Sequence, residues 1–152
     1  MTDDGPDVRE LQPFVGHWSV EAEFPSGDLG VMQGWTTFEW LFDRRFLVQR
    51  SGADHPAAPE VSALIAPDAR RPGEFVQHYF DSRGVVRLYA MTFDGSSWTL
   101  SRTEPDFSPL NFRQRFTGTF TDGADTIRGQ WETSDDGVEW RLDFRLTYHR
   151  TA

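Results

Sequence analysis

The sequence has 152 residues and contains neither cysteine nor lysine. Without cysteine the chain has no disulfide, no zinc–thiolate site and no cysteine nucleophile. Without lysine it cannot form a Schiff base with a substrate or a covalent link to pyridoxal phosphate. All 15 basic residues are therefore arginines, which do not readily lose their proton.

Positive charge and long apolar runs are scarce as well. The net charge of −9 opposes a phosphate backbone, and no cluster of arginines and aromatics forms a nucleic-acid footprint, so we expect no nucleic-acid partner. No apolar run approaches the roughly 18 residues that a spanning helix needs, so we expect no membrane partner. The acidic segment Met1–Pro13 resembles neither a signal peptide nor an anchor, and we expect a cytoplasmic protein.

Helical periodicity is almost absent, apart from a turn or two around Val8–Phe14 that Pro13 limits. From Gly16 onward, short alternating segments are broken by glycine, aspartate and proline, which is typical of all-β proteins. We predict one all-β domain over residues 1–152, a single antiparallel up-and-down β-barrel of about ten strands with a short N-terminal helical turn and an arm at residues 1–13. The expected strands are His17–Phe24, Gly34–Leu41, Arg45–Ser51, Val61–Ala66, Glu74–Asp81, Val85–Phe93, Ser96–Thr103, Phe112–Thr121, Thr126–Thr133 and Val138–His149.

Tight turns predict which side chains point inward, because a turn sets the register and side chains alternate along a strand. A two-residue turn at Asp94-Gly95 pairs Phe93 with Ser96 and, further along, Arg87 with Arg102. The face that carries these residues is bulky and the reverse face is small and polar, so we expect the bulky face inside. It also contains Tyr89, Met91, Trp98 and Leu100.

The turn Ser134–Gly137 gives a similar assignment for the last two strands. It places Trp131 opposite Trp140, and on the reverse face it pairs Arg128 with Asp143. That pair of opposite charges belongs in solvent, which predicts that the two tryptophans face inward. The same reasoning through residues 122–125 and along the first strand predicts further inward residues: Trp18, Val20, Ala22, Phe24, Phe112, Gln114, Phe116, Phe120, and Gly118 facing Gly129.

A polar cluster is expected on the inward face. The turn Asp81–Gly84 pairs Phe80 with Val85 and His78 with Arg87, so His78 should face the interior. Two arginines opposite each other in an interior repel, and a bound anion would compensate them. Alternatively, both arginines reach water at a barrel rim and pair with carboxylates, for which the candidates are Glu104, Asp106 and Glu74.

The opening Leu11–Trp18 places a helical turn before the motif Gly16-His17-Trp18. It resembles the Gly-x-Trp opening of the calycin superfamily, the lipocalins and fatty-acid-binding proteins, and in particular small bacterial lipocalin-like domains of uncharacterised function. The resemblance implies that Trp18 closes the bottom of a cavity. Ten meandering strands match the fatty-acid-binding-protein type, which uses an Arg-x-Tyr pair and a second arginine to hold a carboxylate. Arg87-Leu88-Tyr89 is similar, although it lies on the sixth expected strand rather than the last.

Our first hypothesis is therefore the binding of a small hydrophobic, perhaps anionic, organic ligand inside the barrel. Its candidate binding residues are His78, Arg87, Tyr89, Arg102, Gln114, Trp98, Trp131 and Trp140. An alternative is a cofactor-independent isomerase, cyclase or hydratase in which His78 moves a proton.

Two further expectations concern cofactors and assembly. The four histidines show no metal-ligand spacing and no cofactor is predicted; a haem-binding barrel of the nitrobindin type remains a minor alternative. Alternation places its one axial candidate, His149, outward, and the Gly-x-Trp-x-Gly-x-Gly opening of that type is absent after Trp18. A homodimer is also considered.

Overall fold

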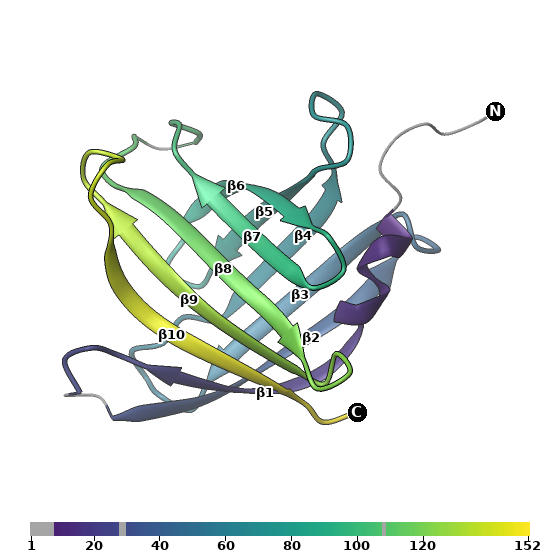
Figure 1. The fold of residues 1–152 in the computed structure, drawn as a ribbon, viewed down its shortest axis with the longest axis horizontal. Helices are drawn as coiled ribbons and strands as arrows, with labels where there is room; N and C mark the ends of the chain where they lie inside the picture. Colours follow the sequence, from purple (N-terminus) through teal and green to yellow (C-terminus); the bar gives the residue numbers. More distant parts are fainter. Residues whose placement is uncertain (1–7, 28–29, 108) are drawn as a thin grey trace.

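The computed structural model describes residues 8–27, 30–107 and 109–152, and these form a closed barrel of antiparallel strands (Figure 1). Each strand pairs with its neighbours in sequence, and β1 pairs with β10 to close the barrel. The predicted fold class is confirmed. The elements are η1 (Val8–Phe14), β1 (Gly16–Glu23), β2 (Val31–Leu41), β3 (Phe46–Ala53), β4 (Val61–Pro67), β5 (Phe75–Asp81), β6 (Val86–Phe93), β7 (Ser97–Arg102), β8 (Arg113–Thr121), β9 (Thr126–Ser134) and β10 (Arg141–Arg150).

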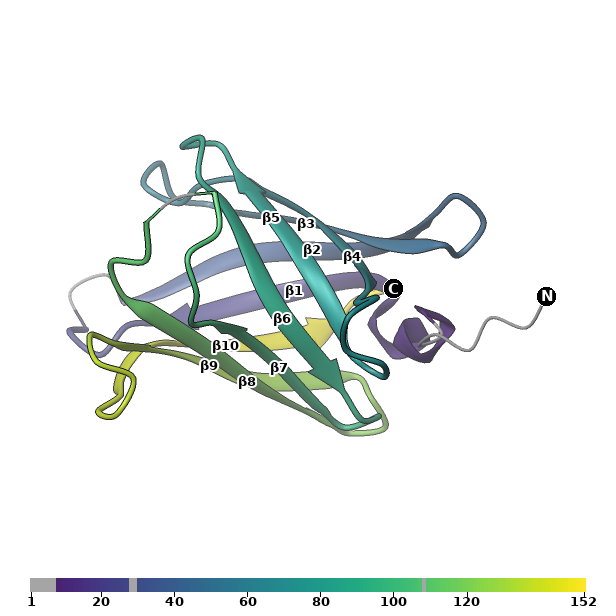
Figure 2. The ribbon, with the colours of Figure 1, turned by 90° about the horizontal axis from the view of Figure 1, so that it is seen from above.

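One end of the barrel is closed by η1, which packs across it (Figure 2). Phe14 is fully buried, and its ring lies 5.0 Å from that of Trp98 and 5.0 Å from that of Phe120. Trp18 is buried beneath the helix and donates its indole N–H to the carbonyl of Phe14 over 2.9 Å. In the described part of the chain, no helix is long and apolar enough to cross a membrane.

Arg150 fastens η1 to the end of β10. Its guanidinium donates hydrogen bonds to the carbonyl of Val15 over 2.7 Å and to that of Pro13 over 2.5 Å. The same group lies 4.2 Å from the centroid of the Trp18 ring, in the arrangement of a cation–π contact. These contacts connect the segment around the end of η1 to the end of β10 at the closed end of the barrel.

The glycine pair on β8 and β9 is required by a ring that lies over it. Gly118 pairs with Gly129, as the turn analysis predicts. A Cβ on Gly129 would lie 2.6 Å from Cε2 of Phe116, which is too close for any side chain. The glycines therefore make room for Phe116, which is buried in the core against Trp98.

The inward face expected for β5 is wrong. His78 pairs with Leu88 rather than Arg87, because the loop before β6 is one residue longer than predicted. Asp81 accepts hydrogen bonds from the backbone N–H groups of Arg83 and Val85, and this local turn adds the residue. A shift of one residue moves every side chain of a strand to the opposite face. His78 consequently points outward, as do Val76 and Phe80, and Phe75, Gln77 and Tyr79 point inward.

The register expected between β6 and β7 is shifted by two residues. Phe93 pairs with Trp98 instead of Ser96, since the Asp94 carboxylate accepts hydrogen bonds from the N–H groups of Ser96 and Ser97 and widens the turn. An even shift preserves the inward face, so Trp98 stays inside. It also separates the two arginines that were expected to lie opposite each other. Arg87 pairs with Tyr79 on β5, and Arg102 pairs with Gln114 on β8.

A longer last turn and a β-bulge at Asp143 overturn the register expected for the last two strands. Thr133 pairs with Arg141, three residues further along the chain than expected, and the bulge between Leu142 and Phe144 adds one more, so Trp131 pairs with Phe144 rather than Trp140. Trp140 stacks on the guanidinium of Arg115, which lies 4.1 Å from its ring centroid and pairs with Glu132. The odd shift at the turn places Trp140 on the outer face, and the predicted Arg128–Asp143 pair does not form.

Candidate ligand-binding cavity

The barrel contains a cavity of about 580 Å³ at the end away from η1. This volume lies within the range of about 300–1000 Å³ that is usual for small-molecule sites. Its mouth is lined by Phe24 after β1, by the loop residues Ala57 and Pro59 before β4, and by Arg83 in the turn after β5. The inner part is lined by side chains that alternate inward along the strands.

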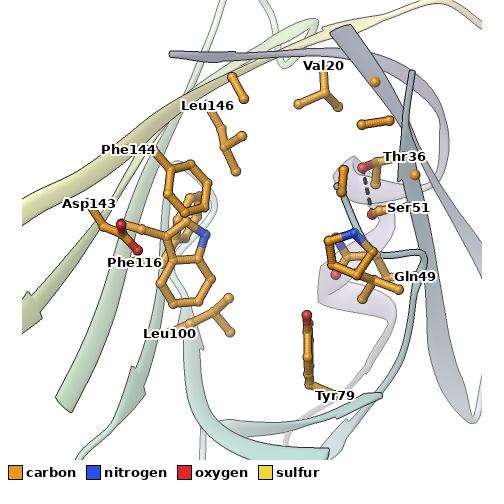
Figure 3. A pocket seen from close by; sticks show the side chains of 18 of the residues that line it. Val20, Thr36, Gln49, Ser51, Tyr79, Leu100, Phe116, Asp143, Phe144 and Leu146 are labelled. Atoms are coloured by element: carbon orange, nitrogen blue, oxygen red, sulfur yellow. Dashed lines mark hydrogen bonds between the residues drawn. The ribbon is translucent and has the colours of Figure 1, made fainter. Parts of the chain in front are cut away.

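One wall of the cavity is apolar. Leu100, Phe116, Phe144 and Leu146 lie together on this side in Figure 3. The ring of Phe116 lies 5.2 Å from that of Trp131, a lining residue on β9. These side chains come from β7 to β10 and offer flat aromatic surface to a ligand.

The wall across the cavity is polar. Its side chains hydrogen-bond in pairs: Thr36 with Ser51 over 2.8 Å (Figure 3), and Gln77, donating, with Gln49 over 2.8 Å. A third pair lies further round the barrel, where Tyr89 donates to the Gln114 side-chain oxygen. The three pairs form a belt that we call the polar belt, which consists of Thr36, Gln49, Ser51, Gln77, Tyr89 and Gln114.

The Gln49–Gln77 contact depends on a small residue between the two strands. Gln49 is on β3 and Gln77 on β5, and β4 lies between them. Ala63 of β4 pairs with Gln49 on one side and with Tyr79 on the other. Because the Ala63 side chain is only a methyl group, the two amides can meet above it.

Arg87 lines the cavity from β6. Its guanidinium lies 5.7 Å from the centroid of the Phe112 ring, and the side chain is half-buried. Within the described residues, no carboxylate forms an ion pair with it. Burial raises the pKa of the neighbouring Tyr89 phenol, although Arg87 partly offsets this rise, so Tyr89 is a neutral hydrogen-bonding group at neutral pH.

A second arginine at the mouth is already neutralised. Arg83 pairs with Asp81 over 2.7 Å, and the Tyr79 hydroxyl donates to the same carboxylate oxygen over 2.8 Å. Burial alone would raise the pKa of Asp81, but the hydrogen bonds from Arg83, Tyr79 and the backbone outweigh it and lower the pKa to about 2. Burial and the bond to Asp81 raise the pKa of Tyr79.

Asp143 brings one carboxyl group to the cavity. The β-bulge turns its side chain toward the lumen, beside Phe144 (Figure 3). Partial burial raises the pKa of this carboxyl, and the nearby Arg141 opposes the rise. The cavity mouth therefore combines one paired arginine, one carboxyl group and Arg87.

Five of the eight binding residues predicted from the sequence line this cavity, and three do not. Those that do are Arg87, Tyr89, Trp98, Gln114 and Trp131. His78 and Trp140 lie on the outer face for the reasons given above. Residues that the sequence analysis missed are Gln49, Gln77, Tyr79 and Asp143. Alternation within β3 and β5 carries a signal for the two glutamines, but the one-residue error in the β5 register concealed it for Gln77.

Arg102 pairs with a carboxylate of the protein, which is the alternative to a bound anion that the sequence analysis offers. It forms a buried two-pronged ion pair with Asp106, with N–O distances of 2.8 and 2.9 Å. The Asp106 carboxylate also accepts a hydrogen bond from the backbone N–H of Leu88. Arg102 is only 3% exposed, so unlike the expectation it does not reach water. It lines a separate hollow of about 380 Å³ next to the main cavity.

No arrangement for a metal ion is found among the described residues, where no group of three histidine, aspartate or glutamate side chains converges. His149 is exposed on the outer face, paired with Ser19 and Thr126, as alternation predicts.

Comparison with known proteins adds a fold likeness. No protein-family model matches the sequence, and no curated protein matches it. Among solved structures, Rv2717c from M. tuberculosis is similar, with a TM-score of 0.69 and 13% identity over 99% of this chain and 100% of that chain. A protein of unknown function from the DUF3598 family of Nostoc punctiforme aligns over 99% of this chain and 100% of its own, at 9% identity and a TM-score of 0.28. At such identities the likeness to Rv2717c concerns the fold alone.

Proposed function

We propose that the barrel binds a small, largely hydrophobic organic anion in its cavity, with Arg87 as the counter-charge. The observation that carries this proposal is the position of Arg87. It is a cation in a cavity of ligand size, and no described carboxylate pairs with it. A carboxylate or sulfonate would accept two parallel hydrogen bonds from the planar guanidinium.

The two other arginines near the cavity already have carboxylate partners, which leaves Arg87 to bind an anion. Arg83 is matched by Asp81, and Arg102 by Asp106, so neither of these two pairs leaves an unmatched charge. Partial removal of Arg87 from water weakens its hydration, and an anionic ligand would replace the lost interactions. The apolar wall would bury the rest of the ligand.

We also propose that the barrel is related to the calycins. The Gly16-His17-Trp18 opening, with Trp18 buried at the closed end, supports a relationship with calycin-type barrels that carry ligands. The Arg87-x-Tyr89 pair supports carboxylate binding, since both residues line the cavity.

The enzymatic alternative is not supported, because its proposed proton-transfer residue does not line the cavity. It rests on His78 as the group that moves a proton, and His78 is on the outer face of β5. We therefore propose ligand binding, rather than catalysis by His78, as the function.

The test uses two probes that share a naphthalene ring, 1-naphthoate, which is anionic, and 1-naphthamide, which is neutral. In isothermal titration calorimetry, Arg87→Met is expected to weaken 1-naphthoate binding about tenfold to a hundredfold, the effect of losing charge-assisted hydrogen bonds. Binding of 1-naphthamide should change less than about twofold. Arg128→Met is the matched control, because Arg128 is exposed on the outer face of β9.

Equal 1-naphthoate affinity in the wild type and Arg87→Met would contradict the role of Arg87. Absence of binding by both probes would contradict the cavity as a site for flat apolar molecules. Mass spectrometry of an organic extract of the purified protein offers a second readout, and the proposal expects an acidic, largely apolar compound.

A further inference from the structure

The polar belt contains three glutamines, Gln49, Gln77 and Gln114, which are all at least nine-tenths buried and line the cavity. They come from β3, β5 and β8, so the fold brings together amides that are far apart in the sequence. Buried side-chain amides normally find partners for their hydrogen-bonding groups. The question is therefore which of these groups the protein itself pairs.

The Gln49–Gln77 bond leaves half of each amide without a protein partner. It uses an N–H of Gln77 and the oxygen of Gln49. Among the described residues, the nitrogen of Gln49 and the oxygen of Gln77 make no hydrogen bond. If both amides turned over, their roles would exchange, and one donor and one acceptor would again remain.

A free donor beside a free acceptor matches a particular ligand edge. A lactam or amide group carries C=O next to N–H, so it can accept from one glutamine and donate to the other. Glutamine and asparagine recognise the edge of adenine through the same kind of double hydrogen bond. A simple alkyl chain would instead leave both amide groups desolvated and unpaired, at a cost in affinity.

The aromatic wall of the cavity favours a ligand with a flat ring. Phe116 lies across the cavity from Gln49 (Figure 3), its ring lies 5.2 Å from that of Trp131, and the ring of Tyr89 lies 5.4 Å from that of Trp131. A planar ligand would contact these rings with its faces or edges and direct its polar edge to the polar belt.

We propose that the ligand is a planar nitrogen heterocycle that carries a lactam- or amide-type edge, read by Gln49 and Gln77, and an acidic substituent. The acidic substituent rests on the proposed function, because its partner is Arg87. The heterocyclic edge is the new element, and it distinguishes this cavity from one that holds a fatty acid.

Two matched acids test the edge. The first is 2-oxo-1,2-dihydroquinoline-4-carboxylate, which has a lactam, and the second is 1-naphthoate, which has the same fused rings and carboxylate position without the lactam. Titration calorimetry with the wild-type protein is expected to show about tenfold tighter binding of the lactam acid, from two added hydrogen bonds. This comparison needs no variant.

Variants then locate the preference. Gln77→Met and Gln49→Met keep the length of the side chain and remove the amide, so each should reduce the preference to about twofold or less while 1-naphthoate still binds. Gln130→Met is the control, since Gln130 pairs with Arg145 and Thr117 and lies outside the cavity; it should retain the tenfold preference. Near-ultraviolet circular dichroism verifies that each variant is folded.

The outcomes separate the two proposals. If both acids bind the wild type equally and Arg87→Met weakens both, the lactam edge is wrong and the anion site stands. If the preference survives in both glutamine variants, the assignment to Gln49 and Gln77 is wrong. If neither acid binds the wild type, both proposals are contradicted.

Discussion

The two ends of the barrel are built from the same strands but differ in packing. At the closed end, the Phe14 and Trp18 rings are buried in the core, and Arg150 joins the helix to the last strand. At the open end, the strands continue but their side chains leave a cavity, and Arg83 and Asp143 stand at its mouth. One end therefore holds the fold together, and the other remains available for a ligand.

This difference shows that the barrel does not need a filled centre. The aromatic cluster around Phe14 supplies a compact core at that end, whereas Phe144 contacts Phe24 at the cavity wall. Substitutions at the two ends should therefore differ in their effect on stability, and the following predictions test that difference.

Removing a ring at each end should produce the largest contrast. Phe14→Ala should lower the free energy of unfolding by about 3–5 kcal/mol, because it leaves a sealed void in the core. Phe144→Ala should cost only about 1–2 kcal/mol, since that ring borders a cavity that is already open. Urea unfolding followed by tryptophan fluorescence measures both, and equal losses would contradict the division between the ends.

The guanidinium contact at the closed end should have an intermediate effect. Arg150→Met removes hydrogen bonds to two carbonyls near η1 and the contact with Trp18, and it should cost about 2–3 kcal/mol. Arg145→Met, on the outward side of the same strand, should stay within about 0.5 kcal/mol. The same urea experiment applies, and a harmless Arg150→Met would show that η1 is held by apolar packing alone.

The smallest effect on the free energy of unfolding should come from the Asp81 carboxylate at the cavity mouth, and it should depend on pH. Asp81 has a pKa of about 2 in the folded protein against 3.8 for the free group, so its ionised form stabilises the fold above pH 3.8. That contribution, roughly 1–2 kcal/mol, is lost as the pH falls from about 4 toward 2.

Asp81→Asn should remove this part of the acid dependence. Unfolding free energies measured from about pH 5, where Asp81 is ionised in both states, down to about pH 2 check this. If the variant and the wild type lose stability in parallel over this range, the Asp81 carboxylate does not contribute as described.

Much of the fold could be predicted from alternation and turn residues. The first strand and the pair β8–β9 were assigned correctly, because their inward residues alternate without interruption and Gly118 meets Gly129 as expected. The errors lie where hydrogen bonds lengthen a turn or where a bulge adds a residue. Asp81 adds one residue before β6, and the longer last turn and the bulge at Asp143 together shift the register of β10.

Those small changes decided the composition of the candidate site. A one-residue shift exchanged His78 for Gln77 and Tyr79 at the cavity wall, and the longer last turn and the bulge exchanged Trp140 for Asp143. Turn residues in the sequence show that a turn exists, but its length depends on hydrogen bonds that form only in the folded loop. Side-chain direction follows from that length, with a period of two.

The sequence by itself determined an antiparallel barrel, its helical turn and an aromatic interior, because these follow from residue periodicity and from turn residues that act locally. Only the tertiary structure decided that Gln49 and Gln77 meet across Ala63, and that Arg102 has a partner while no described carboxylate pairs with Arg87. The contact between Gln49 and Gln77 joins two strands that are not consecutive in the sequence, and its geometry depends on the curvature of the barrel.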